Sequence, residues 1–141
     1  MDTGLVRKRL RSAVDAARRE ATARRSRADA SAKAYEQFLV DVAVPAFRAM
    51  ATALRAEGLP FEVMTPSDAV RLVPERNRDD GITLELDATA DPPMPLVSVT
   101  RSRGSRVVQR ERTVRELTPA EELTDEDVIT MLLEELKPWM A

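Results

Sequence analysis

The first 57 residues carry one helical pattern that is too long for a small domain to cover. Apolar residues recur every three or four positions between residues 4 and 57, and Arg25 is the one break in the row. The roughly 40 residues of helix ahead of Pro45 would span about 60 Å at 1.5 Å per residue. The rest of the chain should form a body only about 25–30 Å across. We therefore expect most of this helix to extend beyond its own body.

The small apolar residues in the extending part predict that it pairs with a second helix. Their spacing follows an 11-residue rhythm, which favours a straight or slightly right-handed pairing over a left-handed supercoil. Alanine keeps this stripe narrow enough for two helices to approach closely, and it has the highest helix propensity. Acidic residues four positions before basic ones, such as Asp15 before Arg19 and Glu20 before Arg24, should support the exposed faces. The residues expected to mediate self-association are Leu10, Val14, Ala17, Ala21, Ala28 and Ala32.

Pro45 lies inside the helical pattern. Proline lacks an amide donor and its ring clashes with the preceding turn, so it either kinks a helix or begins a new one. The apolar rhythm continues in phase through Phe47 and Met50, which favours a kink. From Tyr35 onward the apolar residues also become larger, so this end of the helix should pack on the core. Gly58 predicts where the helix ends.

Beyond residue 60 the apolar period changes from helical to two. Alternation is cleanest at Ile82, Leu84 and Leu86, which predicts a half-buried antiparallel strand. Short polar turns separate the candidate strands, and the turn at residues 102–105 contains a glycine, which suggests a hairpin. Strands in series without intervening helices predict an antiparallel meander of four to five strands. The expected segments are residues 61–63, 69–73, 82–87, 96–101 and 106–114.

The C-terminal residues predict a helix that closes the sheet. Thr124 and Asp127 approximate a capping box, a broad apolar face follows, and Pro138 is expected to end the helix. The fold class is therefore α+β: a long N-terminal helix, kinked or broken near Pro45, an antiparallel meander, and a C-terminal helix packed on the sheet. We expect two parts, a helical, coiled-coil-like arm at residues 1–57 and a small sheet domain at residues 58–141.

The amino-acid composition excludes several kinds of site. The chain has no cysteine and no histidine, so it lacks thiolate ligands, cysteine nucleophiles and the commonest general base near neutral pH. We therefore expect no enzymatic activity, no cofactor and no metal. No run approaches 18 uninterrupted apolar residues, and no apolar signal core follows the N-terminus, so we expect a cytoplasmic protein without a membrane span.

Charge is divided unevenly along the chain, which suggests an acidic partner for the basic part. Residues 1–33 contain ten basic and four acidic residues, a net charge of +6, whereas residues 61–141 contain ten and seventeen, a net charge of −7. Arginines dominate the helix and the hairpin, and arginine suits bidentate contact with phosphate or carboxylate. Candidate anion or nucleic-acid contacts are Arg18, Arg24, Arg27, Arg101, Arg103, Arg110 and Arg112.

Each basic cluster also has a structural interpretation. The helix arginines surround the helix instead of forming one stripe, and no aromatic residue lies among them, which is typical of a solvated surface. The hairpin arginines could pair across strands with Glu85, Asp87 and Glu111. The acidic groups at residues 79–80 and 125–127 fit turn and helix-cap roles better than a cation site.

Two functions remain in competition. The favoured interpretation is a non-enzymatic homo-oligomeric module, acting as an adaptor, chaperone or regulator with a protein partner, that uses the long helix for self-association. The alternative is a nucleic-acid-binding protein that uses the arginine-rich helix or the arginine-rich hairpin. Retention on DNA or heparin at low salt would separate the two.

Overall fold

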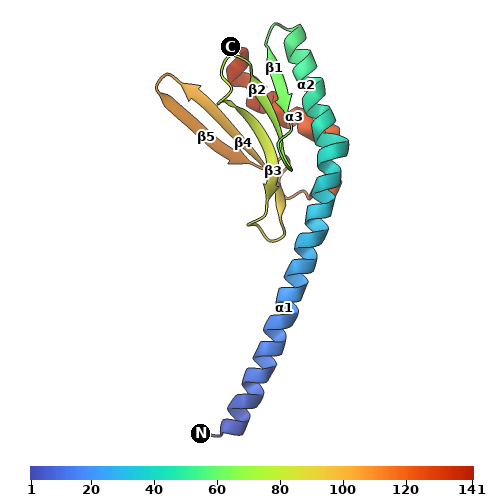
Figure 1. Ribbon diagram of the computed structural model, residues 1–141, viewed down its shortest axis with the longest axis vertical. Helices are drawn as coiled ribbons and strands as arrows, with labels where there is room; N and C mark the ends of the chain where they lie inside the picture. The colour runs from blue at the N-terminus through green and yellow to red at the C-terminus, as the bar shows by residue number, and fades with distance from the viewer.

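A single helical rod dominates the computed structural model, which describes residues 1–141 (Figure 1). The rod consists of α1 (Thr3–Phe38), a π-helical turn η1 (Leu39–Ala43) and α2 (Val44–Ala56). Asp2 caps its N-terminus, because its carboxylate accepts hydrogen bonds from the amides of Gly4 and Leu5. Gly58, with φ of 81°, follows the last turn and ends the helix as expected.

The π turn is how the rod accommodates Pro45. A proline ring inside an α-helix meets the carbonyl of the residue four positions earlier. Here the amide of Val44 donates to the carbonyl of Leu39, five positions earlier, so the turn before the proline is widened. The irregularity predicted near Pro45 takes this form, and the rod continues through it as one helix.

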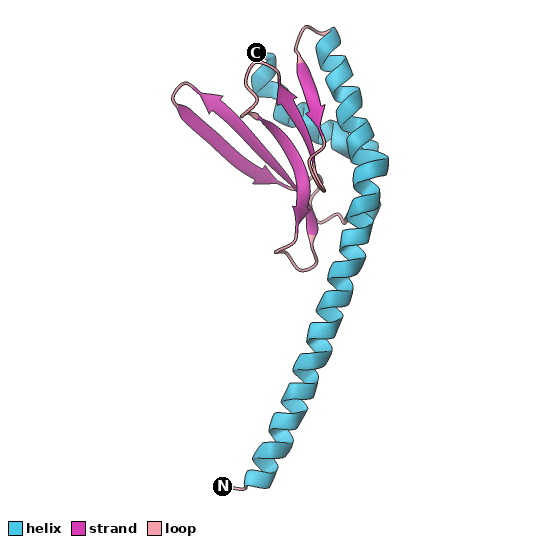
Figure 2. Cartoon of the chain, in the orientation of Figure 1, coloured by secondary structure: helices cyan, strands magenta, loops and turns pink.

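The rest of the chain forms the expected antiparallel meander (Figure 2). Its five strands are hydrogen-bonded in sequence order, β1-β2-β3-β4-β5. The register places Ile82 opposite Val99 and Leu84 opposite Val97, so these apolar side chains share one face. The strands are β1 (Phe61–Met64), β2 (Val70–Pro74), β3 (Gly81–Asp87), β4 (Met94–Arg103) and β5 (Arg106–Arg112).

The C-terminal helix α3 (Asp125–Met140) follows a short 3₁₀ turn, η2 (Ala120–Glu122). Thr124 and Asp127 form the predicted capping box, each side chain bonding to the backbone amide of the other. The prediction that Pro138 ends the helix was wrong, since α3 continues to Met140. So close to the C-terminus the missing amide removes a single hydrogen bond, and the last residues keep their helical geometry.

The core lies between the helices and one face of the sheet. Phe47 of α2, Leu72 and Ile82 of the sheet, and Leu132 and Leu136 of α3 are all 0% exposed. The opposite face of the sheet carries mostly polar residues, as is usual for an antiparallel sheet packed on one side. The α+β layout predicted from the sequence is confirmed.

The rod as a whole is long enough to cross a membrane. One 18-residue window within Thr3–Ala56 has a mean hydropathy of 1.3, and 39% of that window is buried inside the protein. The core helix of a water-soluble domain passes the same test of length and composition, so one such helix is weak evidence for a membrane span.

Candidate functional site

The N-terminal half of α1 stands clear of the body (Figure 1). Residues 1–20 are all exposed, and the first bond to the body joins Arg27 to Asp91 in the β3–β4 loop, at 3.2 Å. We call residues 3–26 the projecting segment. At 1.5 Å per residue it extends roughly 36 Å. A helix of this length has nothing of its own chain to pack against.

One face of the projecting segment is apolar. At 3.6 residues per turn, Val6, Leu10, Ala13, Ala17 and Ala21 fall within an arc of about 80°. Leu10 is 62% exposed and Val6 48% exposed, which is unusual for two large apolar residues on one stripe. Followed along the rod, the same arc leads to core residues further on, so the stripe continues the side of the helix that the body covers.

The six residues predicted to mediate self-association divide between the segment and its base. Leu10, Val14 and Ala17 are exposed on the projecting segment. Ala21 and Ala28 are partly covered, and Ala32 is exposed beside the body. Val6 and Ala13 belong to the same face and were missed, although the spacing of three or four residues before Leu10 and Ala17 already pointed to them. No partner chain is present, so their role in association stays a prediction.

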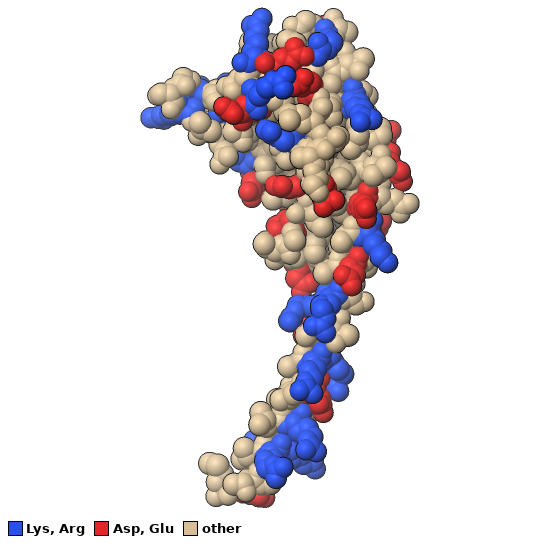
Figure 3. All heavy atoms as spheres, viewed as in Figure 1, with Lys and Arg blue, Asp and Glu red and all other residues tan.

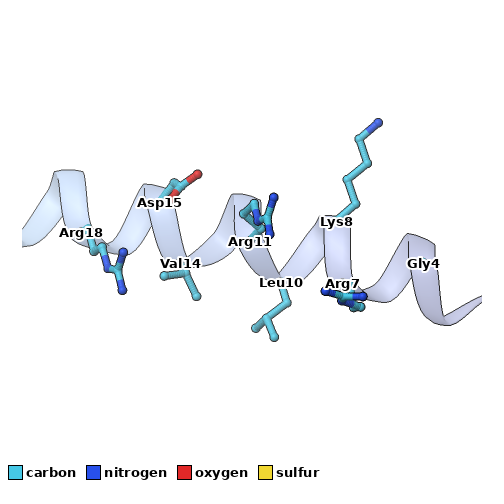
Figure 4. Close-up of a pocket in the computed structure, with 8 residues that line it drawn as sticks. All are labelled: Gly4, Arg7, Lys8, Leu10, Arg11, Val14, Asp15 and Arg18. Atoms are coloured by element: carbon cyan, nitrogen blue, oxygen red, sulfur yellow. The ribbon is translucent and has the colours of Figure 1, made fainter.

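The largest hollow in the molecule lies along this segment, but a single helix forms it. Its lining includes Leu10 and Val14, which point to the same side in Figure 4, together with Arg7, Arg11 and Arg18. All the lining residues come from successive turns of α1, and no second element faces them. The hollow is therefore an open surface bordered by long arginine side chains, and it can take a partner helix but does not enclose a small ligand.

At 100° per residue the basic residues of the projecting segment fall on all sides of the helix as expected, with one local alignment, and Figure 3 shows several of them on one face. Arg7, Arg11, Arg18 and Arg25 fall within about 40° of one another at helical spacing, directly beside the apolar stripe. Neither Arg18 nor Arg24 lies within 4 Å of a carboxylate. Acidic side chains gather instead around the lower part of the body, where the rod meets it (Figure 3).

Arg27 is the exception among the candidate helix contacts, because it is already paired. Its guanidinium donates to Asp91 at 3.2 Å and to Glu20 at 3.3 Å. The hydrogen bond with Asp91 contributes most to raising the pKa of Arg27, and the hydrogen bond with Glu20 raises it further. The expected pairing of Glu20 with Arg24 is not formed, since Glu20 turns to the arginine seven residues later.

The structure divides the hairpin arginines into two groups. Arg110 and Arg112 face α3, where Arg110 pairs with Glu135, and Arg112 donates to Glu134 at 2.6 Å and to Glu135 at 3.3 Å. The side chain of Glu135 is only 4% exposed. The hydrogen bond from Arg112 lowers the pKa of Glu134. Burial lowers the pKa of Arg112, but its bonds to the two glutamates outweigh burial and leave that pKa raised.

The second group has no such partners. Arg101 and Arg103, with Arg106 at the hairpin end, lie within 4 Å of no carboxylate. The register pairs Arg101 with Val108 and Arg103 with Arg106, so all of these share the face of the sheet that carries α3 further along. The charges of these arginines remain available to a ligand.

A hollow of about 170 Å³ lies between this face and the end of α3. Arg101, Arg103 and Val108 form its sheet side, and Pro138 and Trp139 form its helix side. The indole of Trp139 packs edge-on against Phe61, with ring centroids 6.0 Å apart, which fixes its position. The sequence predicted the arginine cluster, but the hollow between these arginines and Trp139 depends on where α3 ends.

The acidic candidates have structural roles. Asp80 is 5% exposed and accepts hydrogen bonds from the amide and hydroxyl of Ser102, at 2.9 and 2.8 Å, which ties its turn to β4. Asp127 belongs to the capping box, and the amide of Glu126 donates to Asp125. No group of three acidic side chains is arranged to hold a metal ion.

Comparison with known proteins found no matching family model, curated protein or solved structure.

Proposed function

We propose that the protein is a non-enzymatic, cytoplasmic interaction module that forms a homo-oligomer through its projecting segment. The observation that supports this most strongly is the exposed apolar stripe on a helix that its own body leaves uncovered. An isolated helix is marginally stable in water, because most helical stability in proteins comes from packing an apolar face. A second copy of the segment would cover Val6, Leu10 and Val14 and stabilise both helices.

The sizes of the stripe residues favour an antiparallel pair. With Ala13 and Val14 at the twofold axis, Val6 lies level with Ala21 of the partner, and Leu10 lies level with Ala17. Each large residue then meets a small one, which keeps the helix spacing uniform. A parallel pair would place leucine on leucine at one end and alanine on alanine at the other. The antiparallel contact is also isologous, so it closes as a dimer.

The charges favour the same orientation. Two segments with a net charge of +6 repel each other most when they are parallel, because all basic groups then lie at equal heights. In the antiparallel register, Arg7 lies level with Glu20 of the partner, and Asp2 lies level with Arg25. The basic tip of each helix also points towards the acidic lower body of the other copy. Such pairing weakens with salt, since exposed charges are screened over about 10 Å at 0.1 M.

Light scattering after gel filtration tests the proposal. We expect wild type to have twice the 15.7 kDa chain mass at micromolar concentration, and Leu10→Asp with Val14→Asp to have the monomer mass. Leu5→Asp is the matched control, because Leu5 is 54% exposed but lies about 120° around the helix from the stripe. A monomeric wild type would refute self-association.

The absence of native cysteines allows the orientation to be tested separately. In an antiparallel dimer, Val14→Cys should form a disulfide with itself, and Leu10→Cys should form one only when mixed with Ala17→Cys. In a parallel dimer, Leu10→Cys alone would cross-link efficiently. The second result would overturn the orientation while leaving self-association intact.

A further inference from the structure

We propose that the uncovered inner face of the β4–β5 hairpin, together with Trp139, binds a nucleotide unit, either free or within a single nucleic-acid strand. The site is separate from the projecting segment and does not depend on self-association. Its components come from β4, β5 and the last turn of α3, which meet around the 170 Å³ hollow.

Three cations without a carboxylate partner supply the anion-binding side: Arg101 and Arg103 line the hollow, and Arg106 lies beside Arg103 at the end of the hairpin. Arg101 and Arg103 are two residues apart on β4, so their side chains leave the same face about 7 Å apart. Arg106 lies directly opposite Arg103 on β5. This spacing is comparable to the distance between successive phosphates in an extended strand. Guanidinium groups bind phosphate through paired, charge-assisted hydrogen bonds, so each of the three is suited to one phosphate.

The carboxylate in the hollow does not cancel this charge. Glu135 contributes to the lining, but its oxygens are bound by Arg110 and Arg112. Those two arginines therefore neutralise Glu135 and tie this residue of α3 to β5. The free positive charge lies further along the hairpin, towards its exposed end.

An apolar wall next to the cations distinguishes a nucleotide from a bare anion. Trp139 is half-buried and lines the hollow together with Val108, which is 47% exposed. Stacking of a base on an aromatic side chain strengthens binding and tolerates any base. Trp139 also borders a second hollow of about 290 Å³, which Phe61 and Arg76 line as well. The two hollows therefore share Trp139 in their linings.

Trp139 is the only tryptophan in the chain, so its fluorescence reports directly on the site. We would titrate the full-length protein at low salt with thymidine monophosphate and with a ten-residue oligothymidine. Both probes should quench Trp139 fluorescence. If the natural ligand is a strand, oligothymidine should do so at a lower concentration than thymidine monophosphate. If the natural ligand is a free nucleotide, the two probes should act at similar concentrations. Inorganic phosphate should compete only weakly, because it lacks a base.

Charge variants locate the binding. Arg101→Gln with Arg103→Gln should weaken oligothymidine binding at least tenfold and lower the salt slope by about 1.4, at roughly 0.7 per lost phosphate contact. Arg18→Gln with Arg25→Gln removes the same charge from the projecting segment and should leave binding within twofold. Urea unfolding of both variants checks that the fold is intact.

Three results would overturn the proposal. Absence of quenching by either probe at low salt would remove the site. Loss of binding in the Arg18 and Arg25 variant, with retention in the hairpin variant, would assign binding to the projecting segment. Equal affinity for inorganic phosphate and nucleotide would show that Trp139 takes no part.

Discussion

Replacing Glu135 by glutamine should destabilise the body by about 2–3 kcal/mol, whereas the same change at its exposed neighbour Glu134 should have a much smaller effect. Both glutamates accept a hydrogen bond from Arg112. Their side chains differ in burial, since Glu134 is 51% exposed and Glu135 is 4% exposed. Each substitution therefore removes one negative charge from the contact between α3 and β5. One charge is exposed and the other is buried.

The magnitude follows from the bonds that Glu135 accepts. A hydrogen bond to a charged group contributes about 1.5–3 kcal/mol, and Glu135 accepts from both Arg110 and Arg112. Glutamine keeps one acceptor oxygen, and Arg110, whose side chain is 60% exposed, can return to water, so the loss is smaller than two full bonds. Removing the cations instead should cost more. Arg110→Ala with Arg112→Ala leaves a buried carboxylate unpaired, which typically costs about 3–5 kcal/mol.

Urea unfolding followed by Trp139 fluorescence measures these differences. Urea is preferable to guanidinium chloride, which is a salt and screens the ion pairs under test. The variants should be made with Leu10→Asp and Val14→Asp already present, so that dissociation does not shift the midpoint. Equal effects of Glu134→Gln and Glu135→Gln would refute the role assigned to burial.

Three further predictions concern the core, a tight turn and acid stability. Leu132→Asp should unfold the body or lower its stability by several kcal/mol, because Leu132 is 0% exposed; an unchanged thermal midpoint would show that this face is open. Gly81→Ala should cost more than Gly104→Ala by urea titration, since an added Cβ would lie 2.6 Å from the carbonyl oxygen of Leu72 at the first site and in open space at the second. Because Arg112 lowers the pKa of Glu134, this carboxylate stabilises the fold above its unfolded pKa, and that contribution is lost as pH falls through the lowered pKa. Urea midpoints from pH 6 to about 3 should therefore fall more steeply in wild type than in Glu134→Gln, and parallel curves would contradict this.

The arrangement of elements could be predicted because periodicity is a local property of the chain. The alternation at Ile82 and Leu84 reflects one buried sheet face, and Thr124 with Asp127 is a capping box visible from spacing alone. Element boundaries were less accurate. Strand β4 begins at Met94 and ends at Arg103, beyond the expected residues 96–101, because pairing with both neighbouring strands extends it.

The partners of the hairpin arginines could not be predicted in this way. The structural interpretation of the hairpin arginines paired them with strand residues, but Glu111 lies opposite Ser98 on the other face of the sheet. Their partners come from α3, more than twenty residues away in sequence. Nothing in the local pattern marks Glu135 as a buried carboxylate, because its burial depends on how α3 crosses the sheet.

The π turn before Pro45 determines which way the apolar stripe of the projecting segment faces around the helix axis, relative to the body. A π turn holds one more residue than the α-helical turn it replaces, and each residue advances a helix by about 100°. The one extra residue between Leu39 and Ala43 therefore sets the rotation of the projecting segment about the helix axis relative to the body. Removing one residue there would leave both parts folded but turn the stripe by about a quarter of a revolution. In a pair of copies joined through their stripes, each body would then lie on a different side of the helix pair.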